Sequence, residues 1–172
     1  MKPPKITLYP LQKSDAFRLA ELFNNKHILD NLRDHIPYPY TENDALDFFD
    51  HIDGNPSEKV CAVFFEGELC GMVSLSLQKD VYRHSAEIGY WLGEPFWGKG
   101  IATEVVAMMT YYGFEKMQLK RIYAIVFENN KASMRVLEKN GYQKEGVLVK
   151  AILKNGELMD EHRYYKLSPN NL

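Results

Sequence analysis

The length, composition and charge of the chain exclude several classes of protein. Its 172 residues fit one domain, which we expect to span residues 1–172. A formal net charge of −2 and an isoelectric point near 6.2 argue against a nucleic-acid-binding protein, which normally has a basic face. No apolar run approaches the roughly 20 residues that a membrane span needs, and the first five residues lack the apolar core of a signal peptide. We therefore expect a cytoplasmic protein with neither a membrane nor a nucleic-acid partner.

Disulfides and metal sites are not expected either. Cys61 and Cys70 lie in neighbouring strand-like segments, where they are typical of small buried side chains in a reducing compartment. No grouping of His, Cys, Asp and Glu has the spacing of metal ligands, so we expect no metal.

The first part of the chain predicts an edge strand followed by two helices. Residues 6–11 alternate in polarity and end beside a proline, which suits an edge strand. After a first helix, residues 24–40 are polar and aromatic, and two X-Pro steps favour extended or turn geometry there. Thr41 with Asp44 then resembles the capping box of a helix over residues 42–52.

Three strands follow. Residues 60–65 and 69–77 are strand-like and are joined across Gly67, which predicts a hairpin. Residues 83–92 continue as a third strand, and such short links favour antiparallel pairing.

The pattern changes in the second half of the chain. Residues 101–117 predict a helix with a wide apolar face, and residues 120–127 are apolar on both faces, as in an interior strand of a parallel pair. Another helix ends at Gly141, and Asn155-Gly156 predicts the turn of a last hairpin.

A glycine-containing turn joins the strand that ends at Leu92 to the helix that begins at Ile101. Without a Cβ, Gly98 and Gly100 permit positive φ and a close approach of an anion to the backbone. The free N–H groups of the helix N-terminus then predict a phosphate site, although such a turn can also be a plain connection. The dinucleotide pattern GxGxxG fails at Thr103, which argues against an NAD-type binder, and no Walker A sequence is present.

The remaining match is to a known family of acyltransferases. Residues 97–102, Trp-Gly-Lys-Gly-Ile-Ala, resemble the pyrophosphate loop of the GNAT superfamily, Gln/Arg-x-x-Gly-x-Gly/Ala, with Trp97 as the departure. That departure is similar to the ribosomal-protein N-terminal acetyltransferase (RimJ/RimL-like) branch. Two further motifs, residues 86–92 and 129–142, add to the resemblance.

The resemblance covers nearly the whole chain, and it implies the fold. It implies an α+β protein with a mixed, mostly antiparallel sheet of about six or seven strands, splayed in the middle, with helices on both faces. We expect residues 168–172 to form a frayed tail.

The resemblance also implies acetyl-CoA as co-substrate. A mid-strand Gly89 favours a bulge, whose free backbone groups would bind the pantetheine arm. The implied cofactor site comprises the end of this strand, the loop and the start of the following helices: Tyr90, Trp91, Leu92, Trp97, Gly98, Lys99, Gly100, Ile101, Ala102, Thr103, Asn130, Ser133 and Arg135.

Acetyl transfer to an amine needs proton transfer, because the amine is almost wholly protonated at neutral pH. Glu87 matches the glutamate that acts as base in some relatives, although it could instead only order water or hold neighbouring backbone. Ser133 matches the serine that protonates the departing thiolate in the ribosomal-protein branch. Leu137 and Ile152 stand where relatives carry titratable groups, which leaves a CoA-binding module without catalysis as an alternative.

Acidic and aromatic residues predict an acceptor groove for a cationic amine. The candidates are Asp34, Tyr38, Tyr40 and Asp160. The resemblance leaves two kinds of acceptor open, a protein N-terminus and a small amine, and it makes a homodimer plausible.

Overall fold

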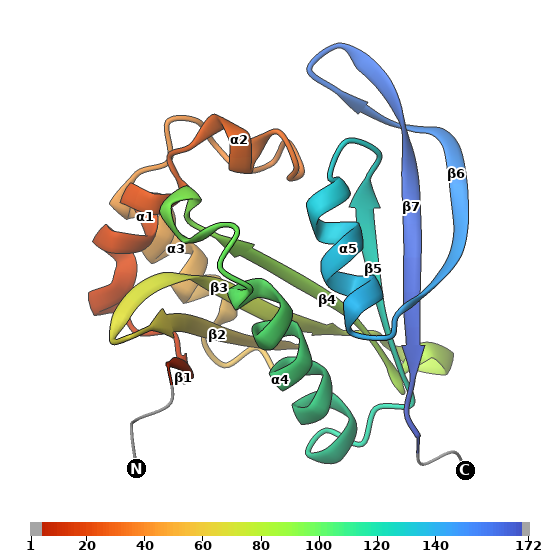
Figure 1. Ribbon diagram of the computed structural model, residues 1–172. Coiled ribbons are helices and arrows are strands. Elements are labelled where there is room, and N and C mark those ends of the chain that lie inside the picture. The colour runs from red at the N-terminus through yellow and green to blue at the C-terminus, as the bar shows by residue number, and fades with distance from the viewer. Residues whose placement is uncertain (1–4, 170–172) are drawn as a thin grey trace.

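A computed structural model describes residues 5–169, which form one mixed sheet with helices on both sides (Figure 1). The strands are β1 (Ile6–Pro10), β2 (Glu58–Phe65), β3 (Glu68–Leu77), β4 (Ser85–Leu92), β5 (Arg121–Phe127), β6 (Gln143–Lys154) and β7 (Glu157–Leu167). The helices are α1 (Ala16–Phe23), α2 (Lys26–Leu29), α3 (Glu42–Ile52), α4 (Ile101–Glu115) and α5 (Lys131–Lys139). Short 3₁₀ turns, η1 (Lys13–Asp15), η2 (Asp80–Tyr82) and η3 (Glu94–Phe96), precede α1, β4 and the loop before α4.

The seven strands lie in the order β1-β2-β3-β4-β5-β7-β6. Within the described residues, β4 and β5 form the one parallel pair, because α4 carries the chain back along the sheet between them. The other neighbouring strands pair antiparallel. The predicted mixed, mostly antiparallel sheet with helices on both faces is confirmed.

Each face of the sheet carries its own pair of helices. The apolar sides of α4 and α5 pack on one face, where Val106 and Leu137 are fully buried against strand residues such as Ile122. On the other face α1 and α3 pack through Leu19 and Phe49. In Figure 1, α1 and α3 lie at the β1 side of the sheet, whereas α5 lies over β5. Two layers of helices therefore enclose the middle strands and hold them in fixed positions.

Local turn and cap signals are found as predicted. The Thr41 hydroxyl accepts a hydrogen bond from the Asp44 amide at 3.2 Å, and the Asp44 carboxylate accepts one from the Thr41 amide at 2.7 Å. Asn155 and Gly156 both have positive φ, 52° and 81°, which suits the tight turn between β6 and β7. The stretch predicted as irregular, residues 24–40, also contains the single-turn helix α2.

Two expectations are wrong. Gly89 marks no bulge, because β4 pairs with β3 in an unbroken register from Ala86 to Leu92. The predicted fraying of residues 168–172 fails at Ser168, which is buried and donates its amide to the Lys120 carbonyl at 3.0 Å. The last three residues of that predicted tail lie outside the described part of the chain.

No helix between residues 5 and 169 is long and apolar enough to cross a membrane.

Candidate active site

The turn before α4 exposes bare backbone. Gly98 and Gly100 have φ of 72° and 78°, and a Cβ added at either would meet no atom within 4 Å. Gly100 is also the N-cap of α4, so no side chain caps the first helical turn. The Thr103 amide donates to the Gly100 carbonyl at 3.1 Å, which leaves the amide N–H groups of Ile101 and Ala102 available to an anion. The positive end of the helix dipole favours an anion there. This open cradle and its donors fit the diphosphate of a coenzyme A.

Trp97 holds this loop against the end of β4. Its indole Nε1 donates a hydrogen bond to the Leu92 carbonyl at 2.7 Å, although the ring is partly exposed. The predicted cofactor role of Trp97 therefore has a physical basis in positioning the loop backbone. Direct contact between its ring and a ligand stays a prediction.

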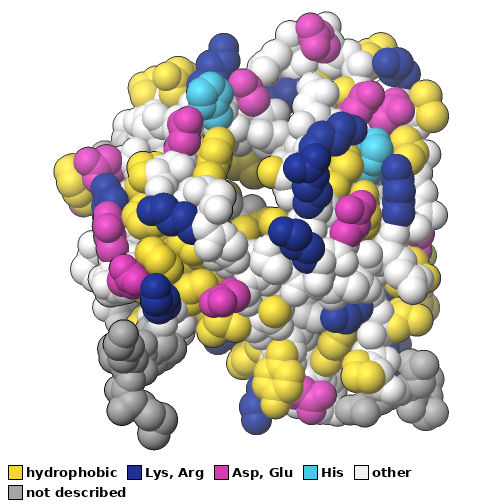
Figure 2. All heavy atoms as spheres, viewed as in Figure 1, with side chains coloured by type: hydrophobic (Ala, Val, Ile, Leu, Met, Phe, Trp, Pro, Cys, Tyr) yellow, Lys and Arg dark blue, Asp and Glu magenta, His cyan; other side chains and the backbone are white. Residues whose placement is uncertain are grey.

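Basic side chains stand near the loop, but not all of them point into it. The Lys99 ammonium lies over the rings of Phe96 and Phe65, at 5.5 and 5.9 Å from their centroids. Arg135 is exposed on α5 and has no ion-pair partner in the described residues. Figure 2 shows a hollow between the side where α2 lies and the side where α5 lies, with Lys and Arg side chains along the α5 side. Arg135 is thus the freer candidate for a phosphate, whereas Lys99 must leave its aromatic contacts to reach one.

An opening between β4 and β5 lies beside the loop. The two strands pair over three residues only, from Ser85 to Glu87 on β4. Beyond Glu87 they diverge, and the β5-facing backbone of β4 up to Leu92 has no strand partner in the described residues. The free edge predicted from a bulge at Gly89 therefore exists, but diverging strands create it. It runs along the predicted Tyr90, Trp91 and Leu92, although the Leu92 carbonyl is already occupied by the Trp97 indole.

Two hydroxyl groups meet across this opening. Tyr90 Oη and Ser133 Oγ are 2.7 Å apart, which joins β4 to the first turn of α5. The Asn130 side chain accepts a hydrogen bond from the Ser133 amide at 3.1 Å, so Asn130 caps α5, and its contact with the cofactor stays a prediction. Burial raises the pKa of Tyr90 to about 12, so its phenol stays protonated at neutral pH. Ser133 is thereby fixed between a helix cap and a buried phenol, whereas Leu137 is fully buried in the core and carries no proton.

Glu87 lies at the narrow end of the opening, on the sheet face opposite α4. Burial raises the pKa of its carboxyl, and the Glu161 carboxylate raises it further. Arg33, whose Nη2 is 3.5 Å from Glu87 Oε1, lowers it, as do the Tyr123 hydroxyl and Arg163. The balance favours a carboxyl group that takes up a proton more readily than an exposed glutamate does. That is the property a general base for an ammonium requires.

Comparison with known proteins now identifies the family. A family model described as an acetyltransferase (GNAT) domain matches residues 5–143. The chain belongs to the GNAT acetyltransferases. It is an acyltransferase of the N-acetyltransferase kind, as the sequence motifs predicted.

Relatives of this GNAT chain have different acceptors in their names. It is 34% identical over 169 residues to "Putative ribosomal N-acetyltransferase YdaF" of Bacillus subtilis (strain 168), covering 94% of this chain and 90% of that protein. It is 29% identical over 153 residues to the spermidine N(1)-acetyltransferase of Escherichia coli (strain K12), covering 88% and 80%. The match to "Uncharacterized N-acetyltransferase YoaA" of Bacillus subtilis, at 40% identity, spans 59% of this chain and just over half, 57%, of that protein.

Solved GNAT structures share the fold over nearly the whole chain. RimL, a ribosomal L7/L12 alpha-N-protein acetyltransferase in complex with coenzyme A, has a TM-score of 0.85 at 23% identity, covering 98% of this chain and 97% of that chain. The spermidine N-acetyltransferase from Vibrio cholerae, in complex with CoA and spermine, has a TM-score of 0.83 at 25% identity, covering 95% and 96%. The prediction of acetyl-CoA as co-substrate is confirmed.

The structure separates the predicted acceptor residues of the GNAT domain. Tyr40 is half-buried beside Phe23, with ring centroids 4.8 Å apart, whereas Tyr38 is exposed. Asp34 forms an ion pair with Lys154 at 2.6 Å. The Asp160 carboxylate accepts the Lys150 amide at 2.8 Å, where the β6 register shifts. Tyr40, Asp34 and Asp160 each have a structural contact, and a direct role in binding an acceptor stays a prediction for all four.

Sequence reasoning missed Lys154 and Arg33, which lie close to the acceptor side. Lys154 is buried, and its ammonium donates to the Leu32 carbonyl at 2.8 Å as well as to Asp34. Lysines are almost never fully buried unless paired, so a lysine in a hairpin is expected to be exposed, and no signal in the sequence indicated this contact. The pairing joins residues about 120 positions apart, which no local pattern can indicate.

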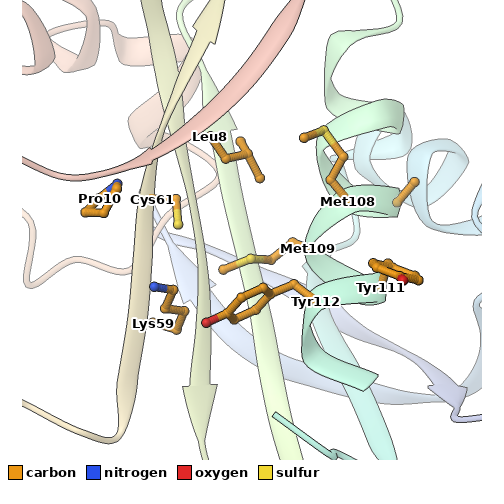
Figure 3. A pocket seen from close by; sticks show the side chains of 9 residues that line it. Leu8, Pro10, Lys59, Cys61, Met108, Met109, Tyr111 and Tyr112 are labelled. Atoms are coloured by element: carbon orange, nitrogen blue, oxygen red, sulfur yellow. The ribbon is translucent and has the colours of Figure 1, made fainter. Parts of the chain in front are cut away.

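A larger cavity elsewhere does not belong to the site. It has a volume of about 570 Å³ and lies between α4 and the β1–β2 edge, with Leu8, Cys61 and Met109 among its lining (Figure 3). None of the predicted site residues lines it.

Proposed function

We propose that this GNAT enzyme transfers an acetyl group from acetyl-CoA directly to a primary amine, either a protein N-terminal amine or a small amine. One observation carries the proposal. Glu87, with its raised pKa, and Ser133, held by Tyr90, flank the opening between β4 and β5. In this proposal Glu87 is the proton acceptor and Ser133 the proton donor, on either side of the place where the free edge of β4 would position a thioester.

The loop and strand residues have a binding role in this proposal. Backbone N–H groups from Gly98 to Ala102 would hold the diphosphate, with Arg135 adding charge from α5. The unpaired edge of β4 beyond Glu87 would hold the pantetheine arm as an added strand. Holding amine and thioester together supplies a large part of the acceleration by itself.

The chemistry left to side chains is proton transfer. Glu87 would accept the proton of the acceptor ammonium, directly or through water, and Ser133 would donate a proton to the departing thiolate. When bound, acetyl-CoA supplies the activated acetyl group. No covalent enzyme intermediate is required, because the amine itself attacks the thioester.

Relatives of both kinds support an amine as the acceptor. The two long matches are named "Putative ribosomal N-acetyltransferase YdaF" and spermidine N(1)-acetyltransferase. The alternative of a CoA-binding module without catalysis has no support among relatives, which are named as acetyltransferases. The homodimer, the cytoplasmic location and the single domain over residues 1–172 stay predictions.

The decisive experiment measures thiol release from acetyl-CoA with a panel of primary amines, and it confirms the acetylated product by mass. Transfer to at least one amine, reduced in Glu87→Gln by 100-fold or more, as for loss of a general base, would support the proposal. Saturable binding of CoA with no turnover on any amine, in a folded protein, would refute it.

A further inference from the structure

A second pocket lies on the sheet face that carries Glu87. It has a volume of about 260 Å³ and is enclosed by α1, α3 and the segment that joins α2 to α3. Its walls are mainly apolar and aromatic, and its lining includes Phe23, Tyr40, Phe48, Phe49, Met72 and Trp91. We call it the aromatic pocket. Its volume lies below the roughly 300–1,000 Å³ typical of whole small-molecule sites, so it suits one group of a ligand and not a complete one.

The aromatic pocket is continuous with the β4 face that carries the candidate base. Side chains alternate along a strand, so Glu87, Gly89 and Trp91 point to the same face. Gly89 is exposed between the other two and leaves an uncovered gap, with the small Ser74 as its partner on β3. At about 3.3 Å per residue, the gap lies about 7 Å from Trp91 and from Glu87 alike. An amine held over Gly89 thus has the carboxylate on one side and the pocket on the other.

The charges around the pocket match an amine that carries an apolar group. Its lining contains two carboxylates, one histidine (His35) and no lysine or arginine, and the Arg33 guanidinium lies outside it, 3.5 Å from Glu87. Asp47 is exposed at the rim, whereas Asp44 is occupied by the amide and hydroxyl of Thr41. A cationic amine is therefore attracted toward this side, while the aromatic walls favour an uncharged, bulky group.

From this arrangement we infer that the aromatic pocket binds a bulky apolar or aromatic group attached next to the reacting amine. The inference rests on the proposed function and narrows its acceptor class. The preferred substrate is an α-amine of a peptide whose first residue is large and apolar, or a small amine with the same kind of group. A polyamine, whose chain carries a charge every few carbons, lacks the group that the pocket accepts.

The acceptor panel tests this preference. Peptides that differ only in their first residue, Phe, Leu, Ala or Gly, are compared with phenethylamine, ethylamine and spermidine. We expect kcat/KM for the Phe and Leu peptides, or for phenethylamine, to exceed that of the Gly peptide or ethylamine by about 10–100-fold, the range for burial of an apolar group. Comparison of the peptides with the small amines shows whether the acceptor is a peptide or a small molecule. Equal values for the bulky and small acceptors overturn the inference.

A variant that fills the pocket tests the assignment, and the same substitution outside the pocket is its matched control. Ile36 lines the pocket on the connecting segment and is partly exposed, so Ile36→Trp is expected to fold and to remove the preference. Val81, on η2, is 72% exposed and outside the pocket, so Val81→Trp should keep it. A preference that survives Ile36→Trp unchanged overturns the inference.

A binding measurement separates this inference from the proposed function. The chain has two tryptophans, so Trp97→Phe leaves Trp91 as its single fluorescent indole. In this protein phenethylamine should change the Trp91 emission saturably, whereas ethylamine should not. Because Ile36→Trp would add a second indole, Ile36→Phe is the pocket-filling variant used in this assay. Without a saturable change for phenethylamine, the pocket assignment fails even if acetyl transfer is found. Transfer without preference refutes the pocket alone, whereas absence of transfer to every acceptor refutes the proposed function.

Discussion

Removal of the Tyr90 hydroxyl should slow the reaction without weakening CoA binding. In Tyr90→Phe, Ser133 loses the partner that lies 2.7 Å from its Oγ. A net hydrogen bond contributes about 1 kcal/mol, and each 1.36 kcal/mol corresponds to about tenfold in rate, so a loss of orientation of this size lowers kcat by about fivefold. Ser133→Ala removes the proton donor itself and should lower kcat further, by up to about 100-fold.

A second hydroxyl pair in the same protein is the matched control. Tyr142 Oη lies 2.7 Å from Thr110 Oγ1 and is buried between α4 and the start of β6. Like Tyr90→Phe, Tyr142→Phe removes one hydrogen bond, so each variant should lower the free energy of unfolding by about 1 kcal/mol, or the melting temperature by about 2–4 °C for a chain of this size. Tyr142→Phe should nevertheless leave kcat unchanged.

Steady-state kinetics and thermal melts of these variants test the reasoning. We expect KM for acetyl-CoA to stay near that of the wild type in Tyr90→Phe while kcat falls. We also expect Tyr90→Phe to add little in a protein that already carries Ser133→Ala, since both changes remove the same function. An equal fall in kcat for Tyr142→Phe, or full additivity in the double variant, would show that Tyr90 acts through packing alone.

Three further predictions concern the base, the loop and a buried lysine. Burial raises the pKa of Glu87, so the rate should fall on the acid side at a pH above the usual carboxyl range, and Glu87→Gln should remove that dependence. A raised pKa in the folded state also means that ionisation of Glu87 lowers the stability of the fold as the pH rises through that pKa. The melting temperature of Glu87→Gln should therefore match or exceed that of the wild type at pH 7.5 and lose that advantage below pH 4. Gly100→Ala places a Cβ at φ 78°, so it should cost about 1 kcal/mol by thermal melting and weaken CoA binding by calorimetry, whereas Gly146→Ala, with open space around it, should do neither. Lys154→Met removes the ion pair with Asp34, so hydrogen exchange in residues 30–34 should become faster, and unchanged exchange would contradict this role.

Much of the fold follows from local signals in the sequence. The capping box of Thr41 and Asp44, and the turn at Asn155-Gly156, depend on contacts between residues within three positions of each other. The exposed backbone at Gly98 and Gly100 follows from glycine itself. Such features are predictable because the residues that cause them are neighbours in the chain.

The opening at the centre of the sheet depends on residues that are distant in sequence. The spacing around Gly89 predicted a free strand edge but gave the wrong cause, because one strand alone does not show how it diverges from another. The contact between Tyr90 and Ser133, 43 positions apart, gave no signal for the same reason. Ser168 was predicted to be frayed for a similar reason: its polar, terminal position gave no indication that its amide bonds to the Lys120 carbonyl.

The link between the β6–β7 hairpin and the N-terminal segment has a consequence for access. Lys154 and Asn155 bond to Leu32, Asp34 and Asp30, so the tip of the hairpin is tied to the segment that also supplies Arg33 to Glu87. Because residues 30–34 are held in place by the hairpin, they restrict access to the Glu87 carboxylate. We therefore expect an amine at a slender, free end to reach Glu87 more readily than an amine in the middle of a broad folded surface.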